Sequence, residues 1–202
     1  AYNTIAVGTG AVGEDLEALK AVFLDVFQSV PDSANATASA LANLNTLTGA
    51  TEKELGDLTK AVLDASRTLG EDGVANSEAF GKALRQWQIP VEDGTNVLDR
   101  LYKLTQDYGI GLGQLNSQLT EYGPVLKNAN FEMDEAAHFF SILKAEGISI
   151  SRIMPALNAS FRRWAVEGKN SRKELQKVIN TIRETEDGQK ALAIATETFG
   201  AE

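Results

Sequence analysis

Three glycines near the N-terminus have the spacing of a loop that binds a dinucleotide; they are Gly8, Gly10 and Gly13. In such a loop the glycines let backbone N–H groups approach a pyrophosphate, and a second parallel strand ends in an acidic residue about 20 positions on. Residues 28–48 instead contain a proline turn and an alanine-rich helical pattern. We therefore expect no cofactor site, and we interpret residues 1–12 as a flexible lead-in.

Residue types that carry catalytic or metal chemistry are scarce elsewhere. The chain has no cysteine and one histidine, which excludes a disulfide framework, a thiol nucleophile and a pair of imidazole ligands. Carboxylates cluster at residues 14–17 and 132–135, each in a predicted first helical turn, where the helix dipole favours negative charge. We interpret His138 as half-buried, and Trp87 and Trp164 as core residues at helix ends. The sequence predicts no catalytic or metal-ligating residue and a protein that is not an enzyme.

Charge is unevenly distributed along the chain. The net charge of −9 argues against the whole chain binding nucleic acid. Residues 1–150 hold 10 basic and 21 acidic side chains, whereas residues 151–202 hold 9 basic and 7 acidic ones. The basic excess, here termed the basic cluster, comprises Arg162, Arg163, Lys169, Arg172, Lys173 and Lys177. Two interpretations stay open: a solvated helix face, or an interaction surface for an acidic neighbour such as the acidic half of another copy.

Helical periodicity runs through most of the chain. Four apolar residues advance by three, four and seven positions, which places them on one helix face; they are Leu55, Leu58, Val62 and Leu69. Strand-like alternation flanked by turn residues is missing beyond residue 10, and apolar stretches fall far short of the ~20 residues of a membrane span. The pattern predicts an all-α protein.

Residues that can end helices recur at nearly regular intervals. Glycine, and to a lesser extent asparagine, accepts the left-handed conformation that closes a helix. Seven candidate ends are spaced by 21, 18, 21, 21, 17 and 21 residues: Gly49, Gly70, Gln88, Gly109, Asn130, Gly147 and Gly168. The spacing predicts antiparallel helices of about 16 residues, each about 24 Å long. We expect residues 13–202 to form a single helical domain with a candidate sub-boundary near 147–150, built either as a helical-repeat array or as an irregular bundle.

Short motifs mark several helix boundaries. Residues 51–54 and 171–174 both fit a capping box, in which Thr51 or Ser171 would accept a hydrogen bond from the first turn. Ser33 follows Pro31 and is expected to cap the next helix. Pro124 lies within an otherwise helical stretch, so we predict a kink or a break there.

Taken in order, these segments resemble the core region of phage tail tape measure proteins over residues 12–200. Gln88 and Asn130 stand where the related proteins usually have glycine, which affects those two turns only. The resemblance rests on Leu44-Asn45-Thr46-Leu47-Thr48-Gly49, Leu55-Gly56-Asp57-Leu58-Thr59, Trp87-Gln88-Ile89, Gln106-Asp107-Tyr108-Gly109-Ile110, Tyr122-Gly123-Pro124-Val125-Leu126-Lys127 and Thr198-Phe199-Gly200.

That resemblance implies a structural role in a phage or prophage tail. Tape measure proteins lie in several copies inside the tail tube, and their length sets that of the tail. The expected partners are other copies, tube subunits and assembly chaperones, with no small-molecule substrate. The expected locations are the tube lumen of the virion tail and, during assembly, the host cytoplasm. Full-length members are far longer, so we expect this chain to be a segment, and one that forms a globular module rather than a rod.

Two other functions remain as alternatives. A generic helical-repeat module would dock a partner protein along a concave face, and an exposed apolar groove with a polar rim would favour it. A cell-wall hydrolase attached to a tape measure chain would need a cleft that raises the pKa of a carboxylate. No motif in the sequence indicates such a cleft.

Overall fold

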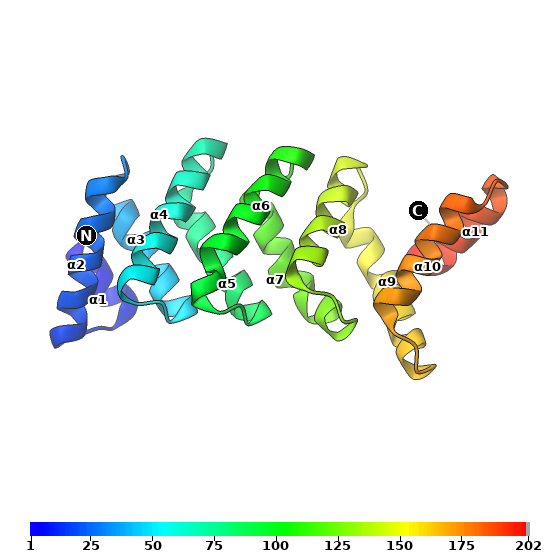
Figure 1. The fold of residues 1–202 in the computed structure, drawn as a ribbon, viewed down its shortest axis with the longest axis horizontal. Helices are drawn as coiled ribbons and strands as arrows, with labels where there is room; N and C mark the ends of the chain where they lie inside the picture. Colours follow the sequence, from blue (N-terminus) through cyan, green and yellow to red (C-terminus); the bar gives the residue numbers. More distant parts are fainter. Residues whose placement is uncertain (201–202) are drawn as a thin grey trace. The chain divides into compact units, whose positions relative to one another are not determined.

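The computed structural model describes residues 1–200, which contain eleven α-helices, one short 3₁₀ helix and no strand (Figure 1). The predicted all-α fold is therefore confirmed. The elements are α1 (Tyr2–Thr9), α2 (Gly13–Ser29), α3 (Ala34–Thr48), α4 (Glu52–Leu69), α5 (Gly73–Trp87), η1 (Val91–Asp93), α6 (Gly94–Tyr108), α7 (Leu112–Asn128), α8 (Met133–Ala145), α9 (Ile150–Val166), α10 (Ser171–Glu184) and α11 (Gly188–Phe199).

Backbone contacts divide the chain into two compact units. The N-terminal unit is Ala1–Glu121 and the C-terminal unit is Tyr122–Glu202, so the division falls within α7. The sequence suggested a sub-boundary near 147–150 instead. That residues 13–202 behave as a single domain stays a prediction.

The helices of the N-terminal unit form two layers. Each helix packs against the next but one along the chain: α1, α3 and α5 lie side by side in one layer, and α2, α4 and α6 in the other (Figure 1). In an ordinary up-and-down bundle, the closest packing would join helices that are consecutive in sequence. Within this unit the structure therefore favours stacked helical hairpins, the repeat-like alternative, over an irregular bundle.

The segment interpreted as a flexible lead-in is helical. Residues 2–9 form α1, which packs against α3 and buries Ile5 completely. A Cβ atom at Gly8 would lie 2.9 Å from the Cβ of Ala42, so this glycine permits the close approach of α1 to α3. Gly10, with φ of 71°, ends α1, and Gly13 begins α2. The glycine motif is thus explained by helix packing and helix ends.

The seven predicted helix ends are confirmed. All have a left-handed backbone, with φ between 57° and 75°: Gly49, Gly70, Gln88, Gly109, Asn130, Gly147 and Gly168. After five of them the next N–H bonds back to the carbonyl five residues earlier, the Schellman arrangement; these bonds are Glu71–Ser66, Ile89–Leu84, Phe131–Leu126, Ile148–Leu143 and Lys169–Trp164. The chain reversals were therefore encoded locally, at single residues.

Of the three predicted N-cap side chains, one makes its capping hydrogen bond and two do not. Ser33 caps α3 as expected, accepting a hydrogen bond from the backbone of Ala36 at 3.2 Å. Thr51 occupies the N-cap position of α4, but its side chain makes no capping bond. The predicted cap at Ser171 is wrong, because Asn170 accepts the bond from the backbone of Lys173 and Ser171 donates to the Phe161 carbonyl.

Two further expectations about single residues are corrected. α7 continues through Pro124 to Asn128, so the predicted alternative of a break is wrong. His138 is exposed rather than half-buried. Trp87 and Trp164 are buried as predicted, and the indole Nε1 of Trp87 donates to the Leu119 carbonyl at 2.8 Å.

Among the helices described, none combines the length and the apolar character needed to cross a membrane.

Candidate interaction surface

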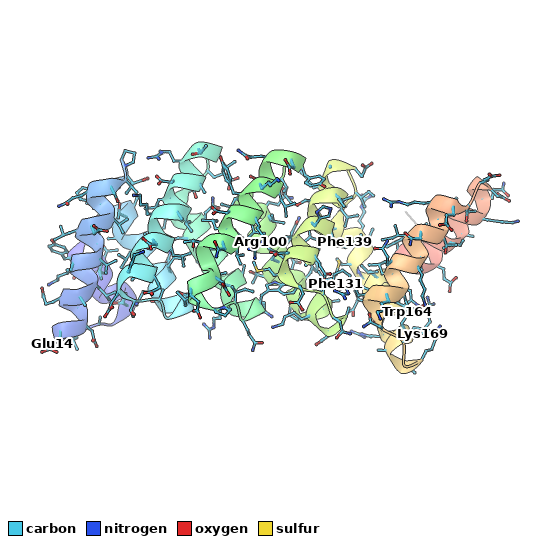
Figure 2. The ribbon with its side chains drawn as sticks, in the orientation of Figure 1. Glu14, Arg100, Phe131, Phe139, Trp164 and Lys169 are labelled. Carbon is cyan, nitrogen blue, oxygen red and sulfur yellow. The ribbon has the colours of Figure 1, made fainter. Side chains whose placement is uncertain are left out.

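The basic cluster is placed on two helices and the turn that joins them. Arg162 and Arg163 lie on α9, and Figure 2 shows Lys169 in the turn below Trp164. The other members, Arg172, Lys173 and Lys177, lie on α10. The structure therefore brings the three α10 cations together along one helix.

Most of these cations are paired with carboxylates of the same chain. The ion pairs are Arg163–Glu197 at 3.4 Å, Lys169–Glu167 at 2.6 Å, Arg172–Glu135 at 2.6 Å and Lys177–Glu174 at 2.6 Å. Within residues 1–200, the side chains of Arg162 and Lys173 make no ion pair, and they line different hollows. Much of the positive charge that the sequence suggested for a partner is thus offset within the chain.

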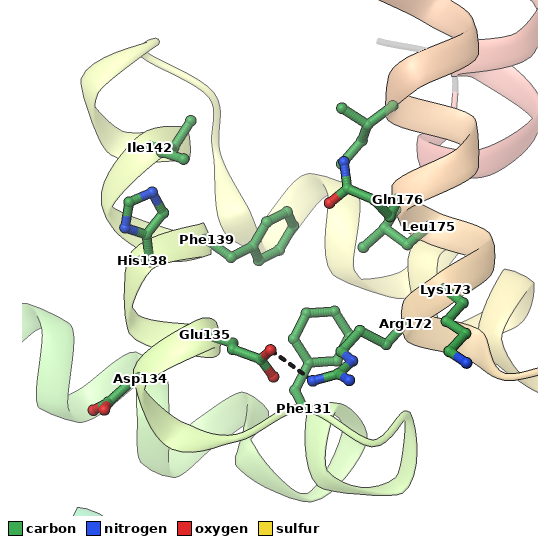
Figure 3. Close-up of a pocket in the computed structure, with 11 residues that line it drawn as sticks. Phe131, Asp134, Glu135, His138, Phe139, Ile142, Arg172, Lys173, Leu175 and Gln176 are labelled. Atoms are coloured by element: carbon green, nitrogen blue, oxygen red, sulfur yellow. Dashed lines mark hydrogen bonds and ion pairs between the residues drawn. The ribbon is translucent and has the colours of Figure 1, made fainter.

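A groove of about 620 Å³ lies between α8 and α10 in the C-terminal unit (Figure 3). Five apolar side chains line it: Phe131, Phe139, Ile142, Leu175 and Ile179. Polar and charged side chains complete the lining: Asp134, Glu135, His138, Arg172, Lys173 and Gln176. A groove lined by both apolar and charged side chains is typical of a surface that binds another helix.

The groove exists because α8 has two apolar faces. One face, which includes Ala136 and Phe140, is fully buried. Phe139 and Ile142, three residues apart, point to the other side, and Ile142 is 40% exposed. In Figure 3 Phe139 points across the groove toward Leu175 of α10. This surface was not predicted from the sequence, although Phe139 and Ile142, a second pair of apolar residues on the same helix, are a signal that could reveal it.

An ion pair joins the two walls of the groove. The guanidinium of Arg172 donates to Glu135 at 2.6 Å, and Glu135 also accepts the backbone N–H of Glu132 at 2.9 Å. The bond from Arg172 holds the pKa of Glu135 below its ordinary value, and partial burial opposes this shift. Because both side chains are about 40% exposed, solvent screens the pair and its contribution to stability is small.

The two units differ in charge. The N-terminal unit carries 17 acidic and 8 basic side chains, whereas the C-terminal unit carries 11 of each. Among the described residues, no group of three His, Asp or Glu side chains could hold a metal ion. What the C-terminal unit offers is an apolar groove with charged walls.

Comparison with known proteins identifies the family. The tape measure protein of Pneumococcus phage Dp-1 is 25% identical over 169 residues, which are 84% of this chain and 15% of that protein, so the chain spans a small part of the relative it matches. No solved structure matches the chain significantly. The family model for phage-related minor tail proteins matches residues 21–200. Since this match covers most of the chain, the chain belongs to the phage-related minor tail protein family.

Proposed function

We propose that this chain is a segment of a tape measure protein that acts in phage tail assembly and in setting tail length. The observation that carries the proposal is the family match over residues 21–200, together with the likeness to the Dp-1 tape measure protein. The family match includes the groove residues and α3 to α6 of the helical stack.

The stacked hairpins support a role through surfaces. Helices of 15–18 residues pack in two layers in α3 to α6, so each further hairpin would lengthen the stack by about one helix spacing, about 10 Å. The same residues in one continuous helix would span about 1.5 Å each. This region therefore suits a folded module that makes helix-face contacts, distinct from an extended measuring rod.

The partners and the location follow from the same proposal. The segment lies in the lumen of the tail tube, contacts tube subunits and copies of itself, and meets assembly chaperones in the host cytoplasm. In this proposal it acts through contacts between surfaces and without catalysis. A peptidoglycan clearing assay that scores positive with the purified chain would contradict this non-enzymatic role.

Removal of residues 21–200 in frame from the phage gene tests the tail function. We expect electron micrographs to show no complete tails, or tails of altered length. Peptides from these residues should also be recovered from purified wild-type tails by mass spectrometry and should resist protease until the tube is opened. Tails of normal number and length after the deletion would contradict the proposal.

The α8–α10 groove favours one alternative function, a helical-repeat module that binds a partner protein. Such a module could bind its partner without being part of an assembled phage tail. It would be supported if the isolated chain bound a partner helix through the groove while the deletion left tail assembly unchanged.

A further inference from the structure

We infer that α7 is a hinge, which bends at residues 120–124 so that the angle between its two halves varies. Three features coincide in this segment: a proline inside the helix, weak hydrogen bonding in the turn before it, and a separate anchor for each half of the helix. The inference concerns the motion of the chain, so it goes beyond the tail function proposed above and does not depend on it.

The backbone of α7 lacks one hydrogen bond in this segment. Pro124 lies inside the helix and has no N–H group to donate to the carbonyl of Thr120, four residues earlier. Gly123 precedes the proline, and without a Cβ atom it avoids part of the clash that drives the residue before a proline out of the helical conformation. Glycine also has the greatest backbone freedom. This pair therefore lets α7 remain helical through Pro124 and provides a point at which it bends.

Side chains weaken the turn that precedes this pair. The hydroxyl of Thr120 donates to the carbonyl of Asn116 at 3.0 Å. A bond of this kind, back to the carbonyl one turn earlier, slightly destabilises a helix and often bends it. The side chain of Asn116 is fully buried, and within the described residues neither atom of its amide has a hydrogen-bond partner. An unsatisfied buried amide lowers the stability of the turn that holds it.

Each half of α7 is anchored in its own unit. In the N-terminal unit, the indole of Trp87 on α5 donates to the carbonyl of Leu119 at 2.8 Å. In the C-terminal unit, the ring of Tyr122 lies 6.0 Å from that of Phe140 on α8. The division between the two compact units falls directly before Tyr122. Bending of the segment between these anchors leaves both of them in place.

A second proline inside a helix provides a comparison. Pro155 lies in α9, but it follows Met154, a buried residue with a Cβ atom, and α9 belongs entirely to the C-terminal unit. A proline inside a helix is therefore not enough to mark a boundary between units. The same substitution at Pro155 is the matched control for Pro124.

Distances between two labels test the inference in the whole chain. The chain has no cysteine, so Lys60→Cys on α4 and Val166→Cys at the end of α9 provide two unique labelling sites at exposed positions, one in each unit. Double electron–electron resonance should give a broad distribution of distances for this pair. Lys60→Cys combined with Val7→Cys, both in the N-terminal unit, is the reference pair and should give a narrow distribution.

Pro124→Ala should stiffen the hinge. The alanine supplies the missing N–H group, so hydrogen exchange across residues 121–128 should slow about tenfold or more. The distance distribution between the two units should narrow toward the width of the reference pair. Pro155→Ala should slow exchange in α9 but leave the width of that distribution unchanged. Circular dichroism and thermal melting verify that each variant is folded.

Three outcomes would overturn the inference. A narrow distribution for the wild-type pair would show that α7 is rigid. Exchange across residues 121–128 that is already as slow in the wild type as in α4 would show that this segment does not open. A distribution that stays equally broad in Pro124→Ala would place the motion elsewhere in the chain.

Discussion

The carboxylate of Glu71 accepts hydrogen bonds from the backbone N–H of Leu112 at 2.8 Å and from that of Gly113 at 3.0 Å. Glu71 follows the helix end at Gly70, and Leu112 begins α7, so one side chain joins the α4–α5 turn to the start of a helix 41 residues further on. Asn76 donates to the same carboxylate at 2.9 Å. A negative group at a helix N-terminus satisfies orphan N–H groups and is favoured by the helix dipole.

Replacement of this carboxylate should destabilise the N-terminal unit. Glu71→Ala removes three hydrogen bonds to a charged acceptor, and we expect the free energy of unfolding to fall by about 1–3 kcal/mol, measured in urea. Glu78→Ala is the matched control, because Glu78 makes one exposed ion pair with Lys82, and its effect should stay within about 0.5 kcal/mol. Equal effects of the two substitutions would contradict the capping role of Glu71.

Gly113 provides a second test of the same junction. Glycine to alanine within a helix ordinarily stabilises by about 1 kcal/mol. Here a Cβ atom would lie 2.6 Å from Oδ1 of Asn76, so Gly113→Ala should lower the melting temperature. Gly56→Ala in α4 is the control, since its Cβ would meet only an ordinary contact of 3.5 Å with Val22. A stabilising Gly113→Ala would show that α7 does not start in this position.

The left-handed helix ends predict opposite effects at two turns. Gln88 has φ of 57°, a conformation strained for a side chain with a Cβ atom, so Gln88→Gly should raise the free energy of unfolding by about 1 kcal/mol. Gly109→Ala should lower the free energy of unfolding by a similar amount, because φ is 67° and alanine is strained in this conformation. No atom lies within 4 Å of the added Cβ atom, so backbone strain alone causes the loss. Differential scanning calorimetry of the two variants measures both shifts; shifts of the same sign would be inconsistent with these turns.

The Arg172–Glu135 pair predicts a pH dependence. The folded pKa of Glu135 is lowered from 4.5, so its stabilisation is present above that pH and is lost as the pH falls through the lower folded value. Glu135→Gln should therefore cost under about 1 kcal/mol at pH 7 and have no effect well below pH 4.5. Urea unfolding across this pH range measures the difference. An effect that grows in acid would contradict the assigned direction.

Helix ends could be predicted from sequence because their cause is local. A positive φ depends on one residue and its immediate neighbours, which is why Gly70 and Asn130 were both identified correctly. The helix over residues 2–9 could not be predicted in this way. Its single fully buried residue, Ile5, gains its environment from α3, which lies about 30 residues further along the chain.

The candidate surface shows the same division between local and distant causes. The cations of the basic cluster could be listed from the sequence, but Arg172 pairs with Glu135, 37 residues away, and no local pattern reveals such a pairing. The groove was missed because the buried stripe through Phe140 is stronger than the second pair formed by Phe139 and Ile142. Two apolar faces on one helix are the signal that would have found it.

Tail length after removal of one hairpin tests the proposed function most directly. Deletion of residues 73–109 from the phage gene removes α5, η1 and α6 with their terminal turn and leaves Glu71 in place. Electron micrographs of many tails should show a shortening of about 10 Å, because the hairpin is stacked. A shortening of about 55 Å would show that it is extended in the tail and would contradict the folded module. Tails of unchanged length and unchanged number would contradict the account.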